Sequence, residues 1–294
     1  MNTPFIHQLP CAGARPRLAF FDVDGTLLDR EGRLSVATIN AITSLQRAGV
    51  STAFATGRPP FAVAHLQEQL QLTGPHVFYT GAHCQHGGTW LAQHRLTVAE
   101  WQPIALAAIA AGLHCEIYYD DKFCIAAPSS IAQEHGRHLG VHAEVLPFAS
   151  WPKVPAYKLL LGAELTQHPE GLVSIEAHFG AQHFAYAHLP SRPQWQFASV
   201  VSGAVDKVAL LKQLVSRIGC GLGEVVSFGD GGSDMDFLRT AGLGIAMGNA
   251  GLEVQQAASF VTRPSCQDGV AYAISHLLKR CPNGAQPLTT VEFE

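Results

Sequence analysis

The sequence predicts an α/β fold in which a parallel sheet carries helices on both faces and a second, α+β domain is inserted into the chain. Short apolar runs alternate with helical patterns near both ends of the chain, and such alternation is typical of a parallel sheet. The middle of the chain, residues 83–202, holds all four tryptophans and most of the histidines. At 294 residues the chain is also longer than a usual single domain.

The first elements of this sheet are predicted before residue 80. The apolar run Leu18–Phe21 and a second run at residues 50–55 are typical of buried strands. A second helix is predicted near Pro60 and a third, short strand at residues 77–79. The first helix is predicted between the first two strands, within residues 35–49, because apolar side chains recur there at helical spacing, at Val36, Ile39, Ile42 and Leu45.

The same pattern resumes near the other end of the chain. A helix is predicted over residues 208–218, and strands over residues 224–228, 243–246 and 259–261. We therefore predict a Rossmann-like core made of residues 1–82 and 203–294, with residues 83–202 inserted as a cap. Ligands of open parallel sheets bind outside the carboxyl ends of the strands, so the polar groups that follow the strands are expected to converge there.

Composition excludes several functional classes. A formal net charge of −4 and a pI near 6.4 argue against a protein that coats nucleic acid, because the lysine and arginine clusters needed for phosphate contacts are missing. No uncharged apolar run approaches signal-peptide or membrane-spanning length, so a cytoplasmic protein without a membrane partner is expected. Seven scattered cysteines, an odd number without paired spacing, suit a reducing compartment. Oligomeric state leaves no recognisable mark in the sequence.

Two carboxylates stand at the end of the first predicted strand. Asp22 and Asp24 directly follow the apolar run, and like charges at such a place cost free energy unless a cation neutralises them. Oxygen ligands of this kind suit Mg²⁺. Asp22 can attack phosphorus as a nucleophile, while Asp24 can protonate the leaving oxygen and later deprotonate water.

Two further segments are suited to a phosphoryl group. Thr56 and Gly57 follow the second predicted strand and offer a hydroxyl and an unobstructed backbone amide, while Arg58 pairs either with substrate or in a salt bridge near the domain junction. Asp206 is a favourable N-cap for the helix that follows it. Lys207 stands in the first turn of that helix, where an anion would offset the opposition between its charge and the helix dipole.

A fourth segment carries two more carboxylates after a buried strand, in the run Gly229-Asp230-Gly231-Gly232-Ser233-Asp234. The glycines allow the backbone to turn sharply and approach an ion. Asp230 is the stronger candidate for a direct metal ligand, and Asp234 is expected to bind the metal, a metal-bound water or Lys207. The acid spacing and the closing glutamate of a calcium-binding EF-hand loop are missing.

Together these segments resemble the haloacid dehalogenase superfamily of phosphotransferases, in its Cof-like branch of sugar-phosphate phosphatases. The matching positions are the four segments above together with two carboxy-terminal runs, residues 244–250 and 268–271. The insertion resembles the larger, subclass B cap of that family. This resemblance implies an aspartyl-phosphate on Asp22, phosphoryl binding by Thr56 and Lys207, and Mg²⁺ held by Asp22, the Asp24 backbone carbonyl and Asp230, with a small phosphorylated metabolite as substrate.

The sequence departs from that family at two positions. Ser233 stands where an asparagine is usual, and Thr80-Gly81 stands where an asparagine-glycine pair is usual. A hydroxyl is shorter than an amide, so the orientation of phosphate or of a metal-bound water is expected to weaken. Besides a phosphatase, two alternatives remain open at this stage: a phosphomutase that uses the same nucleophile, and a catalytically weak regulatory protein that binds phosphate esters. The pairs His83 and His86, or His135 and His138, are weaker candidates for metal ligands.

Overall fold

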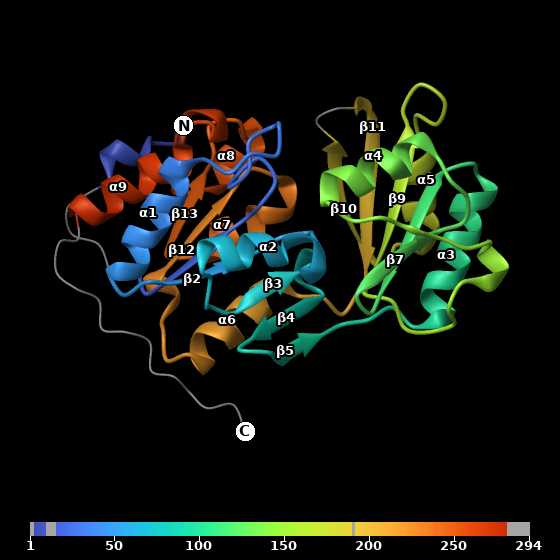
Figure 1. The fold of residues 1–294 in the computed structure, drawn as a ribbon, viewed down its shortest axis with the longest axis horizontal. Helices are drawn as coiled ribbons and strands as arrows, with labels where there is room; N and C mark the ends of the chain where they lie inside the picture. The colour runs from blue at the N-terminus through green and yellow to red at the C-terminus, as the bar shows by residue number, and fades with distance from the viewer. Residues whose placement is uncertain (1–2, 10–15, 190–191, 281–294) are drawn as a thin grey trace.

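The computed structural model describes residues 3–9, 16–189 and 192–280. The C-terminal segment after Cys281, which the sequence predicts to be loose, lies outside the described residues. Figure 1 shows two bodies side by side, a core and a cap. Among the described residues, none of the helices is long and apolar enough to cross a bilayer.

The core contains a five-stranded sheet in which all neighbouring strands run parallel. In spatial order the strands are β14 (Phe260–Val261), β13 (Leu243–Ala246), β12 (Val225–Gly229), β1 (Leu18–Phe21) and β2 (Ser51–Phe54). Phe21 is in register with Phe54 on one side and Phe228 on the other. The residues that follow these strands therefore meet at one edge of the sheet, as the sequence predicts.

Helices cover both faces of this sheet, which confirms the predicted α/β class. The α-helices of the core are α1 (Val36–Arg47), α2 (Pro60–Leu70), α6 (Lys207–Arg217), α7 (Met235–Thr240), α8 (Leu252–Ala257) and α9 (Gly269–Arg280). Alternation along β1 explains the two layers. Ala19 and Phe21 share an apolar cluster with residues of α1, α2 and α9, whereas Leu18 and Phe20 share one with residues of α6 and α7. β1 is thus buried on both faces.

The helix boundaries follow the sequence signals. Helix α1 begins after Ser35, whose side chain accepts a hydrogen bond from the backbone N–H of Thr38. Helix α6 begins at Lys207, directly after the expected N-cap Asp206 and one residue before its apolar pattern, and the Asp206 carboxylate accepts from the Ala209 N–H at 2.9 Å. Short 3₁₀ turns lie at Ile6–Gln8, Tyr79–Gly81, Phe148–Ser150, Leu222–Glu224, Gly232–Asp234 and Ser265–Gln267.

The cap is built on a six-stranded, mostly antiparallel sheet. Its strands are, in spatial order, β10 (His183–Leu189), β11 (Arg192–Val201), β9 (Lys158–Glu164), β6 (His114–Tyr119), β7 (Lys122–Ile125) and β8 (Glu144–Val145), and its helices are α3 (Val98–Ala110), α4 (Ser130–Leu139) and α5 (Gly171–Phe179). One face of the sheet packs in a cluster of its own with α3 and α5. The opposite face shares a cluster with α4 and with the core.

A third sheet joins β3 (His76–Phe78), β4 (His83–His86) and β5 (Thr89–Gln93). The boundary predicted after residue 82 would separate β3 from β4, with which it pairs, and from β5, which pairs with β4 in the same sheet. We therefore propose that the inserted cap starts after β5 and not at residue 83. The second predicted boundary, after residue 202, follows directly on the end of β11, and we keep it as proposed.

Two buried histidines of this third sheet should make the protein sensitive to acid. The N–H of Phe54 donates to Nδ1 of His76, which requires that nitrogen to be unprotonated, and neither ring nitrogen of His83 has a hydrogen-bond partner among the described residues. Burial lowers the pKa of each histidine to about 4. A lowered folded-state pKa means that the unfolded chain binds more protons, so stability is present above pH 6.5 and is lost as the pH falls toward 4.

We expect the free energy of unfolding to fall by about 2 kcal/mol for each of these histidines between pH 7 and pH 5. Denaturant titrations at the two pH values measure this loss, and in His76→Gln the loss should shrink by the share of that one histidine. The matched control is His65→Gln on the exposed side of α2, which should keep the full pH dependence. An equal pH dependence in His76→Gln would contradict the assignment.

Candidate active site

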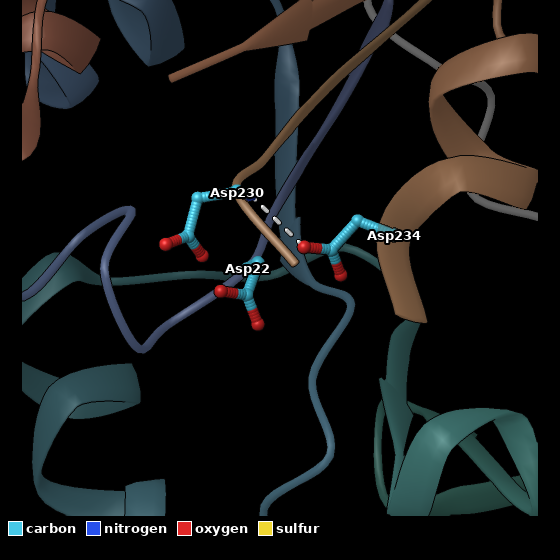
Figure 2. A group of neighbouring side chains, drawn as sticks. All are labelled: Asp22, Asp230 and Asp234. Atoms are coloured by element: carbon cyan, nitrogen blue, oxygen red, sulfur yellow. Dashed lines mark hydrogen bonds between the residues drawn. The ribbon is translucent and has the colours of Figure 1, made fainter. Parts of the chain in front are cut away.

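Three carboxylates meet at the carboxyl edge of the core sheet (Figure 2). Asp22 follows β1, Asp230 follows β12, and Asp234 ends the 3₁₀ turn Gly232–Asp234. Each offers an oxygen atom, and these three oxygens all lie within 4.8 Å of one another. Two backbone N–H groups hold Asp234 in place, because one of its oxygens accepts hydrogen bonds from Asp230 at 3.0 Å and from Gly231 at 2.9 Å.

The pKa values of these carboxyls reflect their crowding. Burial, followed by the charges of Asp234, Asp230 and Asp24, raises the pKa of Asp22 well above its usual range. Burial and the charge of Asp234 raise the pKa of Asp230 to about 7, and burial raises that of Asp234 to about 6 despite the N–H groups it accepts from. A divalent cation among the three would remove the repulsion, and three carboxylate oxygens are the donors that Mg²⁺ prefers. The residues therefore fit that ion.

A glycine and an asparagine hold the Asp230 carboxylate. Asn249 Nδ2 donates to the carbonyl oxygen of Gly25 and to Oδ2 of Asp230, each at 2.9 Å. Gly25 has φ +77°, and a Cβ atom there would lie 2.2 Å from that same Oδ2. The sequence shows only that the run around Asn249 resembles a family signature. The contact with Asp230 adds a role for Asn249, which positions that carboxylate.

Gly25→Ala should therefore weaken metal binding. The added methyl group must displace the Asp230 carboxylate, so we expect the Mg²⁺ concentration needed for half-maximal activity to rise about 10- to 100-fold, the usual cost of disturbing groups that orient metal ligands. Gly88→Ala is the matched control, since Gly88 has φ +81° and no atom within 4 Å of the added Cβ. Equal Mg²⁺ requirements in the two variants would show that only backbone strain matters at Gly25.

Asp24 lies outside the three-carboxylate cluster and is paired with Arg58 and His138. Arg58 donates to it twice, from Nε at 2.8 Å and from Nη2 at 2.6 Å, and His138 Nε2 lies 3.0 Å from Oδ1. Desolvation opposes ionisation, but the hydrogen bonds and charge of Arg58, with a smaller effect from His138, hold the pKa of Asp24 well below its usual range. Of the two alternatives for Arg58, the geometry realises the salt bridge. The proposed metal contact of Asp24 through its backbone carbonyl remains a prediction.

Of the residues expected to bind substrate, Thr56, Gly57 and Lys207 line a single cavity that Asp234 also lines, whereas Arg58 does not line it. Its polar lining consists of Thr56, Gly57, Thr80, Lys207, Ser233 and Asp234. Lys207 donates to the carbonyl oxygen of Ser233 at 2.5 Å. Burial lowers the pKa of Lys207, and the charges of Asp234, Asp236 and Asp22 oppose that shift. Residues far apart in the sequence thus converge as predicted, although Lys207 forms its hydrogen bond with a backbone oxygen and not with the Asp234 carboxylate.

Both departures from the family pattern lie in this cavity. Thr80 has φ +58°, a left-handed conformation that asparagine tolerates far better than a β-branched residue. Its hydroxyl oxygen would lie 3.3 Å from a Cβ at Gly57, so it packs against the Thr56–Gly57 turn. The Ser233 hydroxyl donates to Asp234 at 3.4 Å. Each short side chain therefore has a neighbour inside the site.

Two side chains of the cap reach into the site, and sequence reasoning missed this role for both. His138 comes from α4 and contacts Asp24, and Lys158 begins β9 and donates to the Gly57 carbonyl oxygen at 3.2 Å. The pairing of His135 with His138 as metal ligands is wrong, because Nδ1 of His135 lies 3.0 Å from Glu116 instead. Within the described residues, the acidic cluster above is the only group of three suitable side chains that could hold a metal ion.

A parallel α/β core thus gathers carboxylates and a lysine where its strands end, and an α+β cap brings two further side chains to the same place. The chain belongs to the haloacid dehalogenase-like hydrolases, whose family model matches residues 19–274. This confirms the family that the motifs predict, and with it an enzyme that acts on phosphate esters.

Individual relatives agree with this assignment. The pyridoxal phosphate phosphatase YbhA of Escherichia coli is 28% identical over 283 residues, which cover 89% of this chain and 99% of that protein. The phosphatase YwpJ of Bacillus subtilis is 26% identical over 291 residues, covering 89% of this chain and 100% of that protein. Among solved structures, the subclass IIB sugar phosphatase BT4131 superposes with a TM-score of 0.77 at 26% identity, covering 88% of this chain and 98% of the other.

Proposed function

We propose that this protein is a Mg²⁺-dependent phosphatase that hydrolyses small phosphomonoesters through an aspartyl-phosphate on Asp22. The single observation that carries this proposal is the convergence of Asp22, Asp230 and Asp234, whose oxygens lie within 4.8 Å of one another beside the Thr56 and Lys207 cavity. Phosphoryl transfer needs chiefly position and positive charge, because its transition state spreads negative charge over the phosphoryl oxygens. Lys207 supplies one such charge from this chain.

The proposed roles follow the chemistry of each side chain. A carboxylate oxygen of Asp22 forms a bond to phosphorus while the bond from phosphorus to the leaving oxygen breaks, and Asp24 gives that oxygen its proton. Water then loses a proton to Asp24 and its oxygen bonds to phosphorus while the bond between phosphorus and Asp22 breaks, which releases phosphate and restores both carboxyl groups. The Thr56 hydroxyl, the Gly57 amide and Lys207 bind the phosphoryl oxygens. Asp22, Asp230, Asp234 and the Asp24 carbonyl would hold Mg²⁺, which neutralises charge on the phosphoryl group when bound.

One contact limits the proton transfer. Arg58 and His138 hold Asp24 ionised, and an ionised carboxylate cannot donate a proton. Proton donation by Asp24 therefore requires that these two partners shift when substrate is bound. Arg58 is then a positioning residue that acts through Asp24, in place of the direct substrate contact that was its other predicted role.

Sugar phosphates are the substrate class that we propose first. BT4131, which this chain resembles over most of its length, is a sugar phosphatase, whereas YbhA is a pyridoxal phosphate phosphatase. Sugar phosphates and pyridoxal phosphate are both small phosphomonoesters. The cap side chains that approach the site, His138 and Lys158, are polar and suited to an oxygen-rich molecule.

The test is a panel of phosphomonoesters with Mg²⁺, read by release of inorganic phosphate. Release from sugar phosphates supports the proposal. A hexose bisphosphate separates hydrolysis from transfer, because a phosphomutase would exchange the phosphoryl group between positions without releasing it. Binding of the esters at micromolar concentration with no release over the whole panel would overturn the proposal in favour of a regulatory binding protein.

A further inference from the structure

Lys158 connects the cap to the phosphate-binding turn of the core. It is the first residue of β9, in the middle of the cap sheet, and its Nζ lies 3.2 Å from the carbonyl oxygen of Gly57. Alternation along β9 and β6 places it on the sheet face that also carries Tyr118 and Glu116, away from the cluster that α3 and α5 share with the opposite face. Its ammonium group is therefore presented to the active site.

The surroundings of this ammonium do not satisfy it. Lys158 is only 4% exposed, and its Nζ lies 4.5 Å from the centre of the Tyr118 ring. Within the described parts of the chain, no carboxylate oxygen lies within 4 Å of Nζ, and Gly57 supplies its one hydrogen-bond acceptor. An ammonium has three N–H donors. Two of them are left for a ligand, and a buried charge without partners is costly.

Nearby acids are already occupied. Glu116 is fully buried and accepts from Tyr118, with His114 and His135 at 2.8 and 3.0 Å. Asp24 is held by Arg58 and His138. Burial lowers the pKa of Lys158 to about 8, although the charges of Glu116 and Asp24 partly offset that effect. Glu116 and Asp24 are thus close enough to favour the charged form of Lys158, but they are bound to other partners and form no ion pair with it.

The position of Lys158 matches one part of a substrate. The attacking and leaving oxygens of a phosphoryl transfer lie on opposite sides of phosphorus. Asp22 attacks from the edge of the core sheet, so the leaving group must extend toward the cap. Lys158 reaches the Thr56–Gly57 turn from the cap side. The phosphoryl group would thus be bound by the core, and the first atoms of the leaving group would lie beside Lys158.

We propose that Lys158 is a specificity-determining residue that donates hydrogen bonds to an oxygen of the leaving group, a hydroxyl or a carboxylate near the phosphoester. This inference rests on the proposed function and adds to it the residue that selects oxygen-rich substrates. The rival interpretation is a purely structural contact, in which Lys158 fastens the cap to Gly57. The two differ in what they predict for substrates that lack an acceptor oxygen.

The experiment compares Lys158→Met, which keeps the length and apolar stem of the side chain, with the wild type on three phosphomonoesters. Glucose 6-phosphate and glycerol 3-phosphate carry hydroxyl groups on the leaving group, and phenyl phosphate carries none. We expect kcat/KM for the better of the two hydroxylated substrates to fall about 10- to 100-fold, the effect of losing a charged hydrogen bond. For phenyl phosphate, kcat/KM should stay within about threefold of wild type, an effect below about 0.7 kcal/mol.

Lys153→Met is the matched control, because Lys153 is an exposed cap lysine that also lies over aromatic rings, those of Trp101 and Phe148. It should leave both kinds of substrate unchanged. Equal losses for phenyl phosphate and the hydroxylated esters in Lys158→Met would overturn the proposal in favour of a structural or phosphoryl contact, and so would no loss at all. If Lys158→Met fails to fold, Lys158→Leu, which also lacks a donor, gives the same comparison. A wild type that hydrolyses none of the three would instead contradict the proposed function.

Discussion

Asp22→Asn should abolish phosphate release while the protein remains folded. An amide nitrogen or oxygen is a far weaker nucleophile than a carboxylate, and the other carboxylate that follows β1, Asp24, is bound by Arg58 and His138. We expect the turnover of phenyl phosphate to fall at least about 10,000-fold, as for other enzymes that lose their nucleophile. Phosphate release under saturating Mg²⁺ is the measurement. The corresponding control, Glu253→Gln, removes an exposed carboxylate of α8 and should leave turnover unchanged.

The fold should tolerate this substitution because the carboxylate of Asp22 does not stabilise the metal-free protein. Burial and three neighbouring acids raise its pKa, so the ionised form is disfavoured where it stands. A neutral amide of the same shape relieves that repulsion. Thermal unfolding without added metal should therefore show a melting temperature equal to or above that of the wild type. Turnover within tenfold of wild type, in a folded Asp22→Asn protein, would refute the nucleophile assignment.

Removing divalent cations should reduce activity to background, and Mg²⁺ should restore it. Without a cation, Asp22, Asp230 and Asp234 repel one another and the phosphoryl group of the substrate, which brings further negative charge to the same place. Phosphate release after exhaustive chelation, and then with Mg²⁺ added back, measures the requirement. A ligand that binds only the folded state also stabilises it, by about 2.7 kcal/mol at a concentration 100 times its Kd, so Mg²⁺ should raise the melting temperature.

Asp230→Asn tests whether the cation acts at this cluster. The variant keeps an oxygen for Asn249 but loses a charged ligand, so both the stabilisation by Mg²⁺ and the activity should be much reduced. Full activity in thorough chelator would exclude the metal requirement. If Mg²⁺ raised the melting temperature of Asp230→Asn as much as that of the wild type, the ion would have to bind outside this cluster.

The convergence of Asp22, Asp230 and Thr56 could be predicted from the sequence because it depends on local patterns and one general rule. Each residue follows a short apolar run, and parallel strands bring their carboxyl ends to one edge. The start of α6 at Lys207 followed in the same way from the N-cap type of Asp206. Such features need no knowledge of how distant parts of the chain pack.

The contacts of Lys158 and His138 with the site could not be predicted by the same reasoning. Lys158 is the first residue of an apolar strand and His138 lies in a polar helix, so neither differs in pattern from an ordinary residue of its element. Their roles come from the placement of the cap over the core, which sequence periodicity does not encode. The pairing of β4 with β3 was missed for a similar reason, since strand pairing is decided by contacts between segments and not within them.

The shared contact of Asp24 has a consequence for how large a substrate can be processed. Its two partners come from different bodies of the molecule, Arg58 from the segment after β2 and His138 from α4 of the cap. A molecule bulky enough to hold the two bodies apart would keep His138 away from Asp24 but leave Arg58 in place, so Asp24 would stay ionised and could not donate its proton. The phosphoryl group of such a molecule could still bind in the cavity without being hydrolysed, so the molecule would act as a competitive inhibitor.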